Sequence, residues 1–245
     1  MRSTSSCRSR TRSPRSPPGG SSAARYLPWS CSSARRPETD PREVVARGYD
    51  AVSERYLEWS PLRPSEARLT YVRRALELIP EGARVLELGC GAGVPLTVAL
   101  AEGRTVTGVD ISAAQVEAAR RNAPAATFLH ADMTSLAFDA GSFDAVVAFY
   151  SLTHVPRELV PPLLARIREW LVPGGVLIVT MGVEDDPGTI EDDWLGAPMY
   201  FSHFSARKNR RLVEEAGFVV DSAEILVEPE DRYDARFLWV VAHKS

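Results

Sequence analysis

Three glycines at alternate positions, Gly89, Gly91 and Gly93, directly follow a short apolar segment, residues 85–88. A short apolar run bounded by turn residues is typical of a buried parallel strand. Because glycine has no Cβ atom, such a loop can turn tightly and let a ligand lie against the main chain. The apolar segment 96–100 behind it is expected to form a helix whose first amide groups face the same place. The sequence therefore predicts a small polar ligand at a strand–loop–helix junction.

The spacing of the glycines indicates which ligand the loop accepts. A dinucleotide-binding loop has glycines at its first, third and sixth positions, whereas here the fifth position is Gly93 and the sixth is Val94. The pattern therefore does not fit a pyrophosphate. Glu87 lies two residues before the first glycine, and its carboxylate suits a ligand that carries an ammonium group.

The motif Glu-x-Gly-x-Gly-x-Gly at residues 87–93 resembles motif I of the class I S-adenosylmethionine (SAM) dependent methyltransferases. The resemblance implies SAM as the cofactor, with its methionine end near Glu87 and the glycine loop, Cys90 included. It covers residues 83–181 in register and 41–243 more loosely. It also implies an α/β fold, a three-layer, Rossmann-like, doubly wound sheet of seven mostly parallel strands with the last one antiparallel.

Acidic residues stand where the next two strands are expected to end. Asp110 closes the second apolar segment, and a carboxylate there can accept hydrogen bonds from both hydroxyls of a ribose. Ile111 beside it either covers an adenine face or belongs to the core. After the third predicted strand, the resemblance implies that Asp132 meets the adenine amino group and that the backbone of Met133 meets the ring. The alternative for Asp132 is a helix or turn cap.

The fourth predicted strand, residues 143–149, ends where open α/β sheets bind their ligands. We expect Phe149 to line the cofactor site and Tyr150 the acceptor site. Methyltransferases of exocyclic amines and side-chain amides carry a Pro-Pro-aromatic motif at this place. Because this chain lacks that motif, methylation of DNA adenine or of glutamine is disfavoured.

Helical periodicity precedes the first strand, beginning at Pro41 and again over residues 65–79. Gly-Tyr-Asp at 48–50, followed by Tyr56, resembles the N-terminal cap helix of small methyltransferases. The resemblance implies that Tyr49 and Tyr56 close over the cofactor. Packing of two aromatic rings against the sheet is an equally open alternative.

A long connection, residues 182–204, follows the fifth predicted strand and contains acidic residues and then aromatic ones. A loop of this length is usually functional or mobile, so we expect a lid over an apolar acceptor. Its candidate acceptor-binding residues are Trp194, Met199, Tyr200 and Phe204. The acidic residues are interpreted as a solvated face, and no metal site is expected.

Methyl transfer from a sulfonium depends mainly on positioning and on a dry site. An acceptor hydroxyl with a high pKa would nevertheless need a base. His154 and His203 are the candidates, because a neutral imidazole can take a proton near pH 7. The alternative for each is a histidine satisfied by backbone hydrogen bonds.

Charge is distributed unevenly over the 245 residues, whose formal net charge is −3. Residues 1–36 hold eight of the 29 basic residues and none of the 32 acidic ones, so the remainder carries a formal charge of −11. An acidic body disfavours nucleic acid as a partner, because non-specific affinity for it comes from Lys and Arg. Residues 37–245 are expected to form one methyltransferase domain, with cap helices over 37–80.

The Arg-, Ser- and Pro-rich residues 1–36 are expected to be disordered. An organellar transit peptide, an unstructured extension and translation from a misplaced start are the alternatives for this segment. The longest apolar run, residues 145–150, is too short for a bilayer, and the three cysteines cannot form a disulfide framework. We therefore expect a cytoplasmic protein with no membrane partner.

These observations favour a SAM-dependent methyltransferase that acts on a small, largely apolar molecule. Methylation of RNA or protein is an alternative, to which the basic cluster 207–211 could contribute. A non-catalytic SAM-binding regulatory domain is another, because the cofactor residues do not distinguish an enzyme from a sensor. A nicotinamide-dependent dehydrogenase would need a different glycine pattern.

Overall fold

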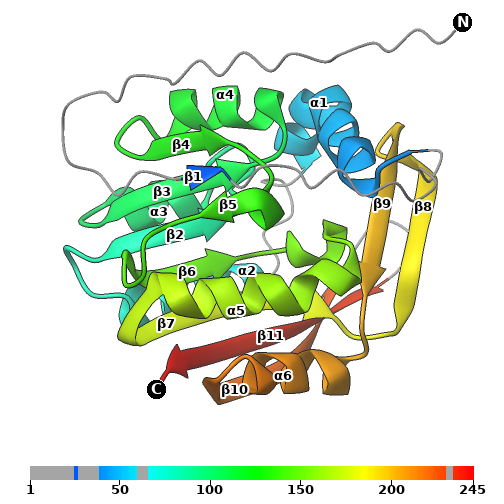
Figure 1. Ribbon diagram of the computed structural model, residues 1–245. Coiled ribbons are helices and arrows are strands. Elements are labelled where there is room, and N and C mark those ends of the chain that lie inside the picture. Colours follow the sequence, from blue (N-terminus) through cyan, green and yellow to red (C-terminus); the bar gives the residue numbers. More distant parts are fainter. Residues whose placement is uncertain (1–24, 27–38, 60–65, 230–233) are drawn as a thin grey trace, which may run out of the picture.

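A seven-stranded sheet between two layers of helices organises the molecule (Figure 1). The computed structural model describes residues 25–26, 39–59, 66–229 and 234–245. In spatial order the strands are β10 (Phe218–Pro229), β11 (Asp234–Lys244), β7 (Leu171–Gly182), β6 (Phe143–Ala148), β2 (Arg84–Leu88), β3 (Thr105–Asp110) and β4 (Thr127–His130). Strands β7, β6, β2, β3 and β4 pair in parallel, and β11 is antiparallel to both β7 and β10. The predicted fold class is confirmed.

Helices cover both faces of the sheet. They are α1 (Pro41–Trp59), α2 (Glu66–Leu78), α3 (Leu96–Ala101), α4 (Ala113–Asn122), α5 (Val160–Trp170) and α6 (Ala206–Glu215). Short 3-10 helices are η1 (Met133–Ser135), η2 (Leu152–His154) and η3 (Arg157–Leu159). Apolar side chains of α5 and α6 pack on one face of the sheet, and those of α2, α3 and α4 pack on the other.

The central strands are mostly apolar because both of their faces are buried. In β2, Leu86 and Leu88 enter the core under α5 and α6, whereas Val85 enters the core under α2 and α3. In β6 the same alternation sends Val146 to the first core and Val147 to the second. This two-sided burial fixes the register of the strands, whose carboxyl ends therefore lie along one edge.

Helix α5 begins at Val160, after η2 and η3, and not directly after the end of β6. Pro161 and Pro162 explain this start, because proline is tolerated in a first helical turn, where its missing N–H has no partner to lose.

The segment 182–204 is a β-hairpin rather than the predicted irregular loop. Strands β8 (Asp186–Trp194) and β9 (Ala197–His203) pair antiparallel. Leu195 and Gly196 join them, both with positive φ, as a tight two-residue hairpin turn requires. The composition of β8 conceals the strand, because Pro187, Gly188 and acidic residues are all depleted in strands.

At the N-terminal end, β1 (Arg25–Tyr26) pairs antiparallel with β5 (Leu136–Ala137). The other residues of segment 1–36, and with them its predicted disorder, lie outside the described residues. Within the described ranges, no helix is both long and apolar enough to cross a membrane.

Candidate functional site

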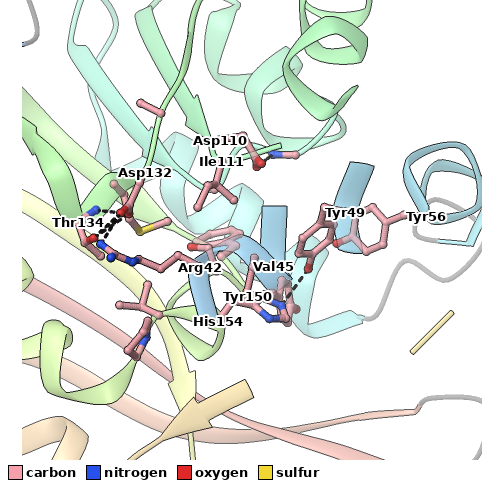
Figure 2. Close-up of a pocket in the computed structure, with 18 residues that line it drawn as sticks. Arg42, Val45, Tyr49, Tyr56, Asp110, Ile111, Asp132, Thr134, Tyr150 and His154 are labelled. Carbon is pink, nitrogen blue, oxygen red and sulfur yellow. Dashed lines mark hydrogen bonds and ion pairs between the residues drawn. The ribbon is translucent and has the colours of Figure 1, made fainter. Parts of the chain in front are cut away.

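Two adjoining cavities lie at the carboxyl ends of β2, β3 and β6, and residues of α1 line both of them. Figure 2 shows the first cavity. Counted together with the open solvent at their mouths, the first spans about 660 Å³ and the second about 560 Å³. They share a wall made of Tyr56, Gly89, Gly91, Phe149 and Tyr150. One elongated ligand could therefore extend from one cavity into the other.

The glycine loop after β2 forms part of this shared wall. Gly89 has φ +75°, and a Cβ atom on it would lie 2.2 Å from the Cβ atom of Ser151. Gly91 has φ +54°, and its N–H donates to Oδ2 of Asp110 at 2.9 Å. Gly93 lines neither cavity and packs closely on Ala119 of α4 instead. Glycine is thus required at Gly89 both by conformation and by space.

Asp110 ends β3 and lines the first cavity while only 8% exposed. Its Oδ1 accepts the N–H of Ser112 at 2.9 Å, and its Oδ2 accepts the N–H of Gly91. Burial raises the pKa of this carboxyl, and the two backbone donors oppose the rise. Since each carboxylate oxygen has a second lone pair, Asp110 can still accept two hydrogen bonds from a ligand.

Glu87 lines the second cavity and is almost completely buried. The hydroxyl of Thr97 donates to its Oε2 at 2.6 Å. Burial raises the pKa of Glu87 to about 8, because one hydroxyl offsets little of the cost of desolvating a carboxylate. A cation entering this cavity would supply the missing compensation.

Asp132 lines the first cavity beside Met133 and caps η1. Its Oδ1 accepts the N–H of Thr134 at 2.8 Å, so the alternative assignment as a cap describes its geometry correctly. Its Oδ2 pairs with the guanidinium of Arg42 at 3.2 Å, and Arg42 also pairs with Asp40. This contact ties the start of α1 to the segment after β4.

His154 ends η2 and faces Tyr49 of α1 (Figure 2). Its Nδ1 lies 2.8 Å from the carbonyl oxygen of Tyr200, an acceptor only, so Nδ1 carries the proton. Nε2 then accepts the hydroxyl proton of Tyr49, 2.9 Å away. Burial lowers the pKa of His154 to about 4, which keeps the imidazole neutral.

Aromatic rings from α1 and the hairpin pack against one another over the first cavity. The ring centroid of Tyr49 lies 5.5 Å from those of Tyr56 and Trp194. Tyr49 and Tyr56 line the cavity, whereas Trp194 supports them from behind. Gly48 allows the close approach, because a Cβ atom there would lie 2.6 Å from the carbonyl oxygen of Pro198.

The other predicted site residues divide into two groups. Ile111 lines the first cavity, Cys90 lines the second, and Phe149 and Tyr150 line both. Four predicted residues of β9 and its end lie outside both walls: Met199, Tyr200, His203 and Phe204. Met199 is fully buried under α1, His203 bonds to the carbonyl of Glu184, and Phe204 packs under the guanidinium of Arg157.

Several residues of the cavity walls were not identified from the sequence: Arg42, Val45, Leu57, Arg68, Val72, Ala92, Val94, Pro95, Leu96, Ala131, Thr134, Ser151, Val155 and Pro156. The helical periodicity after Pro41 predicts that Val45 is buried, but it does not indicate which part of the molecule Val45 faces. Arg42 and Arg68 had no signal, because arginines in a helix are usually solvated. Among the described residues, no group of three or more His, Cys, Asp or Glu is arranged to hold a metal ion.

Comparison with known proteins finds similarity in the central part of the chain. Residues 85–175 match the family model of a methyltransferase domain. A trans-aconitate 2-methyltransferase of Paracidovorax citrulli is 36% identical over 134 residues, 51% of this chain and 50% of that protein. A 27-O-demethylrifamycin SV methyltransferase of Amycolatopsis mediterranei is 33% identical over 183 residues, 68% of this chain and 65% of that protein. The chain spans about half the length of most of the curated relatives it matches.

Among solved structures, a 1,6-didemethyltoxoflavin-N1-methyltransferase of Burkholderia thailandensis superposes with a TM-score of 0.62 and 20% identity. The superposition covers 86% of this chain and 93% of that one. The predicted class I fold is confirmed, and residues 85–175 are similar to a methyltransferase domain.

Proposed function

We propose that this chain, whose residues 85–175 form a methyltransferase domain of the class I SAM-dependent fold, transfers a methyl group from SAM to a small, largely apolar molecule. The observation that carries the proposal is the paired cavity. Its one side, the cofactor half, is formed by Glu87, the glycine loop, Asp110 and Asp132. Its other side, the acceptor half, is formed by Val45, Tyr49, His154, Val155 and Pro156.

The residues of the cofactor half fit SAM. Glu87 is a buried carboxyl without a cationic partner among the interactions described above, which suits the ammonium of a methionine group. Asp110 retains lone pairs for the ribose hydroxyls. Ile111, Met133 and Phe149 offer apolar surface for the adenine ring. Asp132 lines the cavity at the expected place, but the N–H and hydroxyl of Thr134, the hydroxyl of Ser135 and Arg42 already occupy its four lone pairs. It would meet the adenine amino group by exchanging one of these donors.

The bound cofactor supplies a methyl group on a positively charged sulfur, and the chain supplies position and exclusion of water. Holding the reactants in a near-attack geometry can lower a barrier by roughly 7–11 kcal/mol. Tyr49 and Tyr56 close the cavity on the side of α1 and keep water from the reacting atoms. These two side chains therefore act by enclosure, and a dedicated base is not required for every acceptor.

A base role for His154 depends on Tyr49. Since Nε2 of His154 already accepts the Tyr49 hydroxyl, a proton leaving an acceptor hydroxyl reaches it only after Tyr49 moves or passes its own proton on. His203 lines neither cavity, so a direct base role for it requires a rearrangement of β9. Trp194, Met199, Tyr200 and Phe204 are assigned to supporting the acceptor half from outside rather than to contacting the acceptor.

The charges of the first cavity support an uncharged acceptor. Arg42 is paired with two carboxylates, and both oxygens of Asp110 accept backbone N–H groups. The remaining wall toward α1 and η2 is apolar or aromatic. The names of the relatives range from trans-aconitate to a demethylrifamycin, so they do not select one acceptor. The acidic face of β8 does not favour RNA.

Replacing Asp110 tests the assigned cofactor site. We expect Asp110→Asn to weaken binding of S-adenosylhomocysteine at least tenfold, because a hydrogen bond to a charged group is worth roughly 1.5–3 kcal/mol. Isothermal calorimetry measures the affinity, and circular dichroism verifies the fold. The matched control is Asp144→Asn, since Asp144 pairs with Arg84 where β2 and β6 begin, at the opposite edge of the sheet. Unchanged affinity in folded Asp110→Asn would remove Asp110 from the site.

Turnover distinguishes the enzyme from a SAM-binding regulatory domain. Formation of S-adenosylhomocysteine from SAM with a panel of uncharged aromatic and aliphatic hydroxyl compounds supports the enzyme. Turnover confined to polycarboxylates or RNA would instead contradict the proposed acceptor class.

A further inference from the structure

Asp50 is the one residue of the Gly-Tyr-Asp segment 48–50 that has no part in the site described above. Its side chain is exposed and lines neither cavity. The carboxylate nevertheless has a fixed place, because its Oδ1 accepts the hydroxyl of Ser112 at 2.6 Å and the N–H of Ala114 at 3.1 Å. Both partners belong to the start of α4, which lies beside α1 (Figure 1).

Helix α4 lacks an acidic residue where a helix favours one. The unpaired N–H groups of the first turn leave a partial positive charge at a helix N-terminus, so that a nearby Asp or Glu is stabilising. No residue in the first turn of α4 is acidic. Asp50 supplies the negative charge from α1 instead, 64 residues before its partner Ala114. The start of α4 is therefore a place at which a charged group holds α1.

Ser112 links this contact to the cofactor half. It is the N-cap of α4 and is completely buried, and its hydroxyl accepts the N–H of Gln115 while it donates to Asp50. The N–H of Ser112 itself donates to Oδ1 of Asp110 at 2.9 Å. Contacts that hold the Ser112 side chain also hold its backbone, and with it the direction of that N–H. Asp110 is thus connected to α1 through one intermediate residue.

We propose that Asp50 is a positioning residue for Asp110: by holding Ser112, it keeps the Asp110 carboxylate directed at the ribose hydroxyls of the cofactor. The proposal rests on the proposed function, because it assumes a ligand with a ribose in the cofactor half. It also gives α1 a second role besides enclosing the first cavity. Since coupling between two sites is reciprocal, a ligand bound to Asp110 favours the docked position of α1 as much as docked α1 favours the ligand.

The charge of Asp50 and its accepting oxygen have opposite effects on Asp110. Burial is the main cause that raises the pKa of Asp110, and the neighbouring charge of Asp50 adds to the rise. Asparagine at position 50 would remove this repulsion and keep an oxygen that accepts from Ser112 and from the first turn of α4, where Asn caps about as well as Asp. We therefore expect cofactor affinity to depend on the oxygen at position 50 rather than on its charge.

A double-mutant cycle between Asp50 and Asp110 tests the proposal, with calorimetric titration of S-adenosylhomocysteine as the measurement. We expect Asp50→Ala to raise the Kd about three- to tenfold, because it removes the oxygen that holds Ser112. Asp50→Asn is expected to stay within about twofold of the wild-type Kd. In the Asp110→Asn background, Asp50→Ala should change the Kd less than about twofold, since the carboxylate through which it acts is gone. Glu54→Ala, which removes an exposed acid one turn further along α1, is the control and should leave the Kd unchanged.

The cycle separates a positioning role from simple fastening of α1. Equal weakening by Asp50→Ala with and without Asp110→Asn would mean that Asp50 only fastens α1, and would overturn the proposal. Unchanged affinity in folded Asp50→Ala would also overturn it, as would an Asp50→Asn variant as weak as Asp50→Ala. If circular dichroism shows that Asp50→Ala does not fold, Ser112→Ala removes the same contact and takes its place in the cycle. Failure of the wild-type chain to bind S-adenosylhomocysteine would instead contradict the proposed function.

Discussion

The two halves of the cavity are held in place by different kinds of contact. In the cofactor half, Asp110 is fixed by two backbone N–H groups, and Gly89 is fixed by contact with Ser151. In the acceptor half, Tyr49 and His154 meet through a single side-chain hydrogen bond between segments 105 residues apart. The first arrangement moves only if the sheet moves, whereas the second can open when α1 shifts. The proposed function thus places the cofactor in a site fixed by backbone contacts and the acceptor beneath a contact between side chains.

Replacing Gly89 should break the cofactor half most severely. In Gly89→Ala the new Cβ atom would lie 2.2 Å from that of Ser151 at a φ of +75°, so both collision and backbone strain oppose folding. We expect a loss of about 3 kcal/mol or more in unfolding free energy, and loss of measurable S-adenosylhomocysteine binding. Urea unfolding measures the first and calorimetry the second.

Gly82→Ala separates the two causes. Gly82 has φ +78°, and a Cβ atom on it would meet no atom of the described residues within 4 Å, its chain neighbours aside. Strain alone is expected to cost about 1–2 kcal/mol there and to leave binding intact. Equal losses in the two variants would mean that the collision at Ser151 is unimportant.

The pH dependence of cofactor binding should report Glu87. Its carboxyl has a pKa of about 8 in the free protein and must be ionised to pair with an ammonium group. Binding therefore releases a proton below pH 8, and the Kd of S-adenosylhomocysteine is expected to rise about tenfold per pH unit as the pH falls from about 7.5 to about 6. Glu87→Gln should bind weakly at all these pH values without that slope. A wild-type affinity that is constant across this range would contradict a neutral Glu87 in the free site.

Removing the Tyr49 hydroxyl should separate the two halves. Tyr49→Phe leaves Nε2 of buried His154 without its donor, which is expected to cost about 1 kcal/mol of stability. The affinity for S-adenosylhomocysteine should change less than about threefold, while the rate of methyl transfer falls by a larger factor. A change confined to cofactor affinity would place Tyr49 in the cofactor half instead.

The smallest effect is expected for Arg42→Gln. The ion pair between Arg42 and Asp132 joins α1 to η1 with both side chains partly exposed, and such pairs contribute at most about 1 kcal/mol. The Kd of S-adenosylhomocysteine should rise about two- to threefold at low salt and less at high salt. The exposed pair of Arg47 and Glu43 on the same helix provides the control, so Arg47→Gln should leave the Kd unchanged.

The cofactor half could be predicted from the sequence because its residues lie at fixed distances from strand ends. Glu87, Gly89 and Asp110 each belong to a strand or to the residue after it, and parallel pairing of β2 with β3 brings them together. Apolar segments of four to six residues are enough to locate such strands. The spacing of the glycines then indicates the ligand.

The acceptor half could not be predicted in the same way, because its wall is assembled from α1 and η2 and supported by the hairpin. The aromatic residues of segment 182–204 suggested a lid, but pairing of β8 with β9 turns Met199 under α1 and carries His203 and Phe204 away from the cavities. The sequence of a strand as rich in acidic residues as β8 does not indicate locally which strand it pairs with. Arg68 was missed for a similar reason, since its stacking partner Tyr150 is far away in the sequence.

Calorimetric titration of the wild-type chain with S-adenosylhomocysteine, with NAD as the control, tests the central claim most directly. A rigid site built from Glu87, the glycine loop and Asp110 predicts saturable binding of S-adenosylhomocysteine at one site per chain, and no binding of NAD. Binding of NAD, or no binding of S-adenosylhomocysteine, would contradict the account.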